Sequence, residues 1–194
     1  MSRPTLTTER LVLEPLGEQH LDDLVGLDAD PAVMRLLTGR AATRAEVVGT
    51  WLPRRTRPDA DERGIGCWTG RHEGVFAGWW SLAVDDDDPT AAELGYRLRR
   101  TAWGRGLATE GAAALLSHAF GTVGLQRVWA ETMAVNTASR RVLEKVGLRH
   151  VSTYVGQWDD PIPGWEAGEV VYEVTRDDHR PGVGRSIEQD PIPG

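Results

Sequence analysis

The sequence has little cysteine, little lysine and no long apolar run. Its 194 residues include one cysteine, Cys67, which excludes an internal disulfide and a cysteine-based zinc site. No stretch approaches the roughly 18 consecutive apolar residues of a membrane-spanning helix. The first residues also lack the apolar core and small-residue cleavage site of a secretory signal peptide. These absences predict a cytoplasmic protein without a membrane partner.

Positive charge is scarce as well. The chain has 29 acidic and 22 basic residues, a formal net charge of −7, which argues against nucleic-acid binding through the bulk of its surface. Only Lys145 is a lysine, so the other 21 basic residues are arginines, whose planar guanidinium groups suit phosphate oxygens. The acidic run at residues 85–88 is typical of a solvated loop, with attraction of a cationic substrate as the alternative. The five histidines show no metal-ligand spacing, so we expect no metal site.

The remaining composition is that of a globular protein. Hydrophobic residues make up 40% and charged residues 26% of the chain, both ordinary fractions. The length fits one domain, which we place at residues 1–178. Residues 179–194 are rich in glycine, proline and charge, a composition that predicts a flexible C-terminal tail.

Hydrophobic periodicity and capping residues predict an ordered series of strands and helices. Strands are expected at residues 9–16, 65–71, 75–84, 92–98, 127–133, 148–155 and 170–175. Helices are expected near residues 20–27, after Asp30-Pro31, and at residues 44–55, 107–120 and 137–146, with a polar loop at 57–64. Trp79 and Trp80 are consecutive in one of these strands and should therefore face opposite sides. A meander followed by alternating strands and helices predicts an α/β fold, a mixed sheet with helices on both faces.

A glycine-containing turn opens the long helix that begins near Leu107. Gly104 and Gly106 let the backbone approach a ligand closely, and the first helical turn presents N–H groups without internal partners. These donors and the helix dipole favour a phosphate or pyrophosphate. The turn lacks the Gly-Lys-Ser/Thr ending of a P-loop and has Thr109 where a dinucleotide fingerprint requires a third Gly or Ala. A plain strand-to-helix turn remains the alternative.

A second motif follows the strand at residues 127–133. Asn136 is placed to cap the next helix, and Ser139 falls in its first turn. With residues 94–98, 103–110 and 136–147 in this order and spacing, the chain resembles the GNAT superfamily of acyl-coenzyme A N-acyltransferases. Within it the chain looks most like the ribosomal-protein alanine N-acetyltransferase branch (RimJ/RimL-like). The resemblance extends from Thr7 to about Thr175.

The resemblance implies a GNAT fold, a mostly antiparallel meander with one splayed parallel strand pair. Acetyl-coenzyme A, or another acyl-coenzyme A, would bind as co-substrate, its pyrophosphate on the turn before the long helix and its pantetheine arm between the splayed strands. The residues that the resemblance assigns to the cofactor are Leu98, Arg99, Trp103, Gly104, Arg105, Gly106, Leu107, Ala108, Thr109, Asn136, Ser139 and Arg140.

The resemblance also implies catalytic residues. Many superfamily members carry a tyrosine acid at the position of Leu143, so that acid is absent here, and Ser139 matches the serine of the RimJ/RimL-like branch. Glu93 lies where many members carry a catalytic glutamate, with a solvated strand residue as the alternative. Relatives in that branch instead carry a glutamate near Trp158, which makes Asp159 a second candidate base. A base or water relay must remove the proton from the attacking amine.

The function that follows is transfer of an acetyl or other acyl group to a primary amine, such as a protein N-terminus or a small amine. The alternative is a coenzyme A-binding module with weak or no turnover. The sequence is silent on oligomeric state; dimers are common among relatives, so a homodimer is suggested by analogy alone.

Overall fold

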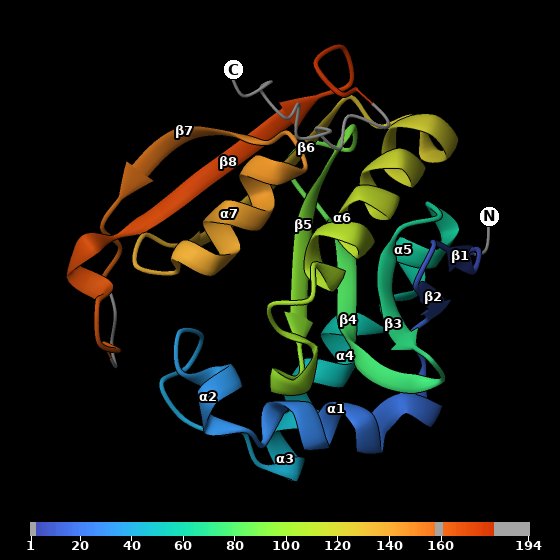
Figure 1. Ribbon diagram of the computed structural model, residues 1–194. Helices are drawn as coiled ribbons and strands as arrows, with labels where there is room; N and C mark the ends of the chain where they lie inside the picture. The colour runs from blue at the N-terminus through green and yellow to red at the C-terminus, as the bar shows by residue number, and fades with distance from the viewer. Residues whose placement is uncertain (1–2, 158–160, 181–194) are drawn as a thin grey trace, which may run out of the picture.

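The computed structural model describes residues 3–157 and 161–180, and its centre is one eight-stranded sheet (Figure 1). The strands are β1 (Leu6–Thr7), β2 (Leu11–Pro15), β3 (Gly66–His72), β4 (Val75–Val84), β5 (Ala91–Leu98), β6 (Arg127–Met133), β7 (Arg149–Tyr154) and β8 (Glu169–Thr175). Their spatial order is β1-β2-β3-β4-β5-β6-β8-β7. Every neighbouring pair is antiparallel except β5 and β6, which are parallel. The predicted mixed sheet with one parallel pair is therefore confirmed.

Helices cover both faces of this sheet, as the alternation of elements predicts. The α-helices are α1 (Leu21–Asp28), α2 (Pro31–Met34), α3 (Arg44–Glu46), α4 (Leu52–Arg55), α5 (Pro58–Glu62), α6 (Leu107–His118) and α7 (Thr137–Lys145). Short 3₁₀ or π turns lie at η1 (Glu18–His20), η2 (Val47–Trp51), η3 (Arg100–Ala102), η4 (Ala119–Val123) and η5 (Trp165–Ala167). Figure 1 shows α6 and α7 in front of the strands, with α1, α2 and α3 gathered at the lower end of the sheet.

Strand alternation sorts the large side chains of β3 and β4 between the two faces. Trp68 pairs with Trp80 across the strands, and both indoles are fully buried with α6 in the main hydrophobic core. Trp79 points the other way, against a second cluster that includes Leu24 of α1 and Leu52 of α4. The prediction that Trp79 and Trp80 face opposite sides is confirmed.

Some local predictions are wrong at the element boundaries. The segment 57–64, expected as a loop, contains α5, because Pro58 occupies the first helical turn, where its missing N–H costs nothing. The expected helix at 44–55 is interrupted by the π turn η2. Its start is as predicted, since the Thr43 hydroxyl accepts a hydrogen bond from the Glu46 N–H.

The described residues include the first two residues of the predicted C-terminal tail. His179 donates its backbone N–H to the Thr175 carbonyl at 3.0 Å, and its ring lies 4.9 Å from that of Phe120. Residues 181–194, the remainder of the predicted tail, lie outside the described residues.

Candidate active site

The centre of the site is the place where β5 and β6 part. They pair only from Ala91↔Arg127 to Glu93↔Trp129, although β5 continues along β4 as far as Leu98. Beyond Glu93 the strands therefore diverge, and Figure 1 shows β6, β8 and β7 running away from β5 at an angle. The predicted splayed pair is confirmed, and the edge of β5 beyond Glu93 is not paired with β6.

The phosphate-type turn stands where β5 leads into α6. Gly104 and Gly106 adopt φ values of 69° and 80°, left-handed conformations that favour glycine. Gly106 is the N-cap of α6 and supplies no side chain to it. In the described part of the chain, the N–H groups of residues 104–109 have no hydrogen-bond acceptor. Because Leu107, Ala108 and Thr109 form the first helical turn, their donors and the helix dipole can hold an anion.

Two indoles fix this turn against the sheet. Trp103 donates its Nε1–H to the Leu98 carbonyl at 2.9 Å, and Trp80 donates to the Ala108 carbonyl at 3.2 Å. Arg99 donates its backbone N–H to the Ala77 carbonyl, and its guanidinium lies 5.8 Å from the Phe76 ring. The Arg99 side chain is therefore packed on the protein. The turn offers a ligand chiefly backbone atoms.

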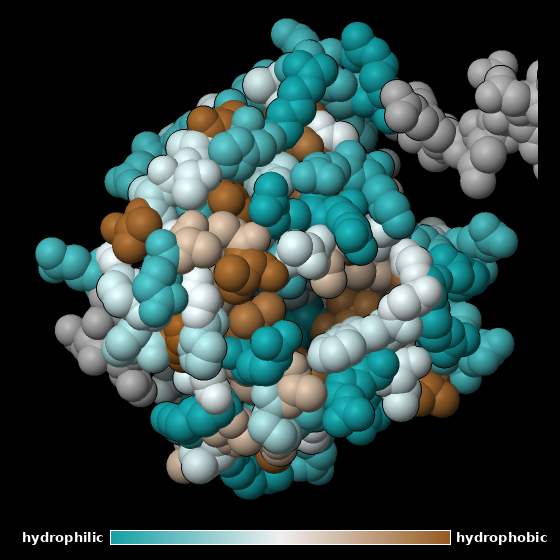
Figure 2. All heavy atoms as spheres, turned by 60° about the vertical axis from the view of Figure 1, so that its left-hand side comes forward, coloured by the Kyte–Doolittle hydropathy of each residue, from teal (hydrophilic) through white to brown (hydrophobic). Residues whose placement is uncertain are grey.

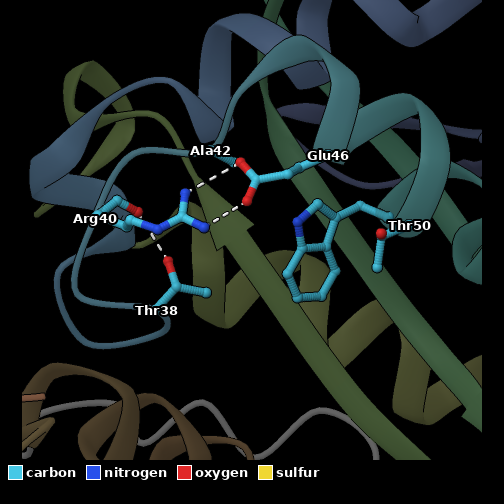
Figure 3. A pocket seen from close by; sticks show the side chains of 6 residues that line it. Thr38, Arg40, Ala42, Glu46 and Thr50 are labelled. Carbon is cyan, nitrogen blue, oxygen red and sulfur yellow. Dashed lines mark hydrogen bonds and ion pairs between the residues drawn. The ribbon is translucent and has the colours of Figure 1, made fainter. Parts of the chain in front are cut away.

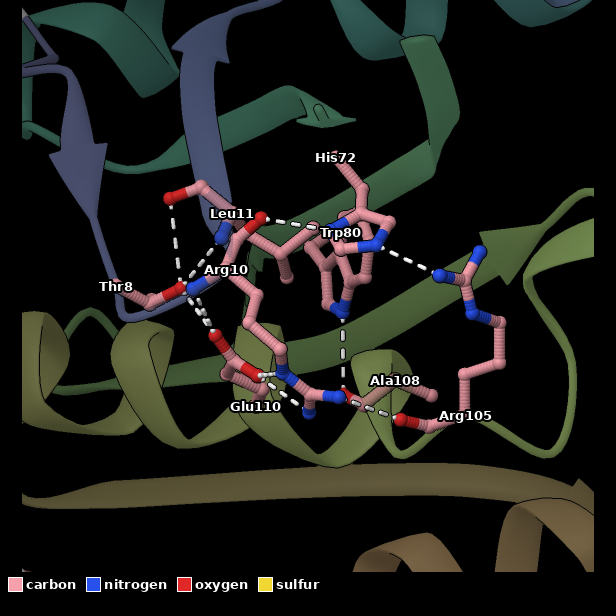
Figure 4. Close-up of polar contacts among 8 residues, drawn as sticks. All are labelled: Thr8, Arg10, Leu11, His72, Trp80, Arg105, Ala108 and Glu110. Carbon is pink, nitrogen blue, oxygen red and sulfur yellow. Dashed lines mark hydrogen bonds and ion pairs between the residues drawn. The ribbon is translucent and has the colours of Figure 1, made fainter. Parts of the chain in front are cut away.

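The N-terminal segment also braces the turn (Figure 4). Arg10 donates its Nε–H to Glu110 at 2.7 Å and an Nη1–H to the Arg105 carbonyl at 2.9 Å. The Thr8 hydroxyl donates to the same Glu110 carboxylate at 2.5 Å. Arg105 itself donates to Nε2 of His72 at 2.8 Å, so its guanidinium points to β3 while its backbone belongs to the turn. The sequence motif alone carries no sign of this orientation.

At the start of α7, the predicted cofactor residues are engaged within the chain. Asn136 caps the helix by accepting from the Ser139 N–H at 3.2 Å and donates to the Thr132 hydroxyl at 3.1 Å. Arg140 donates to the Tyr172 hydroxyl and the Ala134 carbonyl, each at 3.1 Å. The cap predicted for Asn136 is confirmed. The side chain of Arg140 is held against β8.

Ser139 has a partner that the sequence reasoning missed. Its hydroxyl lies 2.9 Å from the hydroxyl of Tyr96, which spans the splay from β5 to α7. Burial raises the pKa of Tyr96 to about 12, with the hydrogen bond to Ser139 acting in the opposite direction. Tyr96 lies within the motif at residues 94–98, yet only the packing of α7 on the sheet brings it to Ser139.

The Glu93 side chain lines a cleft on the face of the sheet opposite to α7. The cleft has a volume of about 450 Å³ and is lined by Leu36, Leu37, Glu93, Glu131, Thr132, Met133, Tyr154, Gly156, Gln157 and Glu169. Figure 2, which brings this side of the molecule forward, shows a hollow near the centre with both hydrophilic and hydrophobic atoms around it. Burial raises the pKa of Glu93, and the charges of Glu131 and Asp85 raise it further. A carboxylate with a raised pKa is suited to accept a proton near neutral pH.

Glu131 and Glu169 are further cleft residues that the sequence reasoning missed. Alternation along β6 and β8 places both carboxylates on the face opposite the main core, which is also the pattern of a solvated strand face, so the sequence carries no signal that they line a cleft. The alternative base Asp159 lies outside the described residues, and Gln157 is the last described residue before it.

A smaller cavity of about 180 Å³ lies between the 38–42 loop and η2 (Figure 3). Arg40 closes it with an ion pair to Glu46 at 2.5 Å, and this hydrogen bond is the main reason that the pKa of Glu46 is lowered to about 2. Its charges are matched within the chain, which distinguishes it from the cleft at Glu93.

The described residues show neither a metal-binding cluster nor a membrane-spanning helix. They contain no group of three His, Cys, Asp or Glu side chains placed to hold a metal ion. Nor does any of their helices have the length and apolar character needed to cross a membrane.

Comparison with known proteins gives the family. Residues 10–149 match the model of the acetyltransferase (GNAT) domain. An Aspergillus fumigatus protein named FsC-acetyl coenzyme A-N(2)-transacetylase is 40% identical, over 95% of this chain and 83% of its own length.

Solved structures share the fold. A GNAT-family acetyltransferase from Bacillus anthracis superposes with a TM-score of 0.75 at 19% identity, covering 90% of this chain and 99% of its own. RimL, the ribosomal L7/L12 alpha-N-protein acetyltransferase, solved in complex with coenzyme A, superposes with a TM-score of 0.73 at 17% identity, covering 89% and 98%. The splayed strands and the turn before α6 are thus those of a known architecture, and the chain belongs to the GNAT acetyltransferase family.

Proposed function

We propose that this GNAT acetyltransferase moves the acetyl group of acetyl-coenzyme A to a primary amine held in the cleft at Glu93. The observation that carries the proposal is the position of the splay, which lies between a turn of unpaired N–H groups and a half-buried carboxylate. The 40% identical relative from Aspergillus fumigatus, named as an N(2)-transacetylase, supports transfer to a nitrogen atom. The narrower RimJ/RimL-like branch, the cytoplasmic location and the homodimer stay predictions.

The turn and the splay would hold the co-substrate. Backbone N–H groups from Gly104 to Thr109 face the pyrophosphate, because charge-assisted hydrogen bonds to phosphate oxygens are strong. The unpaired edge of β5 offers hydrogen bonds to the amides of the pantetheine arm. Bound acetyl-coenzyme A supplies the thioester carbonyl that the amine attacks.

The side chains on either side of the splay divide the proton transfers. Glu93, directly or through a water, takes a proton from the acceptor ammonium, and the neutral amine then forms the C–N bond. When the tetrahedral intermediate collapses, the C–S bond breaks, the attacking nitrogen gives its second proton to solvent, and the Ser139 hydroxyl gives its proton to the thiolate and is re-protonated from solvent. Tyr96 is a positioning residue that orients the Ser139 hydroxyl.

A coenzyme A-binding module without turnover is the second candidate. The observation in its favour is Leu143, a buried side chain at the position where many superfamily members carry a tyrosine that acts as the general acid. Binding alone does not separate the two candidates, because both keep the phosphate turn.

Calorimetric titration with acetyl-coenzyme A, with ATP and NAD as controls, tests the phosphate turn. Release of coenzyme A thiol in the presence of amines then tests turnover. We expect Ser139→Ala to keep acetyl-coenzyme A affinity and to lower kcat by about 10²–10⁴-fold. The cap survives this change because the Ser139 backbone N–H, not its hydroxyl, binds Asn136.

Ser117→Ala, an exposed serine of α6, is the matched control and should leave kcat unchanged. Thiol release that is undetectable in the wild type, despite saturable binding of acetyl-coenzyme A, would favour the binding module. Equal affinity for ATP would contradict both candidates.

A further inference from the structure

One face of the sheet carries a row of three carboxylates, which belong to Glu93, Glu131 and Glu169. We call this row the acidic row. Glu93 pairs with Trp129, and Glu131 lies two residues further along β6. Met133, two residues beyond that, pairs with Glu169. Side chains two apart in a strand share a face and lie about 6–7 Å apart along it. The acidic row therefore follows the floor of the cleft outward from the point where β5 and β6 part.

Glu169 is the member of the row that most requires a ligand. It is only 8% exposed and lines the cleft, and among residues 3–157 and 161–180 its carboxylate has no hydrogen-bond donor and no cationic partner. Burial and the charge of Glu131 both raise the pKa of Glu169. The side chain is largely buried but faces the cleft, so a cation or hydrogen-bond donor bound there would supply the partner that Glu169 lacks.

The residues that the structure describes supply no such cation to the cleft. No arginine, lysine or histidine is among the described lining residues, and the Tyr154 hydroxyl donates instead to Glu131 at 2.6 Å. Glu173, on the same strand and face as Glu169, is by contrast ion-paired with Arg127 at 3.6 Å. Of the two carboxylates of β8, Glu173 therefore has a cationic partner, whereas Glu169 has none among the described residues.

Because the unpaired charge lies inside the proposed acceptor site, we propose that the acceptor is a small amine carrying at least two cationic nitrogens. One nitrogen lies at Glu93 and is acetylated, while a second, still protonated, lies between Glu131 and Glu169. Leu36 and Leu37 on the cleft wall offer apolar contact to the alkyl chain that joins them. This inference rests on the proposed function, since it takes the cleft as the acceptor site.

Matched amines test the second cation. Thiol release is measured with hexamethylenediamine and octamethylenediamine against hexylamine and octylamine, which have the same alkyl chains and one nitrogen fewer. A hydrogen bond to a charged group contributes about 1.5–3 kcal/mol, or roughly ten- to a hundredfold in affinity. We therefore expect the diamines to have a kcat/KM at least about tenfold higher, through a lower KM.

Isosteric variants assign the effect to the acidic row. Glu169→Gln removes the charge with little change of shape, so the ratio of diamine to monoamine kcat/KM should fall about tenfold. Glu173→Gln, on the same strand and face but paired with Arg127, is the matched control and should keep the ratio of the wild type. Thermal unfolding of both variants separates a binding effect from a loss of fold.

The outcomes distinguish this inference from the proposed function. Equal use of diamines and monoamines by the wild type overturns the dication inference and leaves the N-acetyltransferase proposal standing. An unchanged ratio in Glu169→Gln also overturns it. Calorimetric titration of the coenzyme A-saturated protein with diamines measures binding even if no amine is acetylated. If no amine is acetylated, diamine binding to this protein supports the acidic row and contradicts the proposed N-acetyltransferase, and absence of binding contradicts both.

Discussion

At the scale of single residues, the most informative side chain is Glu93. It lies at the last paired position before the strands part, half-buried on the cleft side. Burial and the neighbouring Glu131 and Asp85 charges raise its pKa toward the range where a proton acceptor works best at neutral pH. In the proposed function the same negative neighbours would attract a cationic amine, so binding and proton removal would depend on one electrostatic environment.

The raised pKa of Glu93 predicts the acid limb of the activity profile. A base acts only when deprotonated, so kcat/KM should be lost as pH falls through a pKa above the usual glutamate range. Glu131→Gln removes one of the charges that raise this pKa and should move the acid limb to lower pH. A pH series of thiol release on wild type and variant measures the shift, and Glu93→Gln should lose about 10²–10⁴-fold in rate. An acid limb that stays in place in Glu131→Gln would contradict this assignment.

At the scale of elements, the packing of α6 on the sheet positions the glycine turn that precedes this helix. Gly111 brings the helix directly onto the indole of Trp80, which also donates to the Ala108 carbonyl. The Arg10–Glu110 ion pair at 2.6 Å ties the same helix to the N-terminal segment. A helix seated by a glycine and an indole leaves little room for displacement of its first turn.

Gly111→Ala should therefore disturb both stability and cofactor binding. A Cβ at this position would overlap the Trp80 indole, and overpacking of this kind costs about 1–3 kcal/mol. We expect a melting temperature lower by several degrees and weaker binding of acetyl-coenzyme A, measured by thermal unfolding and calorimetry.

Gly121→Ala is the matched control for this change. Nothing lies within 4 Å of a Cβ built at Gly121, so this variant should be at least as stable as the wild type. Equal melting temperatures of the Gly111 and Gly121 variants would show that α6 is not seated on Trp80 as described.

At the scale of the whole molecule, a buried charge group joins the helical layer to the sheet. Asp28 of α1 is fully buried and pairs with Arg97 of β5 at 2.6 Å and with Arg55 of α4 at 3.2 Å. Both guanidinium groups lie over the Trp79 ring, at 5.3 and 4.6 Å. Because two buried cations share one carboxylate, its removal leaves both without a counter-charge.

Asp28→Ala should therefore destabilise the protein by about 3–5 kcal/mol, the usual cost of breaking a buried ion pair. The measurement is urea unfolding of wild type and variant. Asp22→Ala is the matched control on the same helix, because Asp22 forms an exposed ion pair with Arg44 and should contribute only about 0–1 kcal/mol. Similar losses in the two variants would contradict the structural role of Asp28.

The local features of this protein can be predicted from neighbouring residues along the chain. Strands β4 and β6 match their predicted bounds, and the Asn136 and Thr43 caps form as expected. The glycines at 104 and 106 mark the turn before α6. Alternation, capping and left-handed glycines are properties of a few neighbouring residues, so they can be read along the chain.

Which distant side chains come into contact depends on the tertiary fold. The acidic row depends on the register of β5, β6 and β8, and the contact of Tyr96 with Ser139 depends on how α7 packs across the splay. No local pattern encodes the pairing of strands so far apart in sequence, because register is set by the shared core and by neighbouring strands. The family and the glycine turn before α6 were therefore predictable, whereas the electrostatic character of the cleft at Glu93 came from the fold.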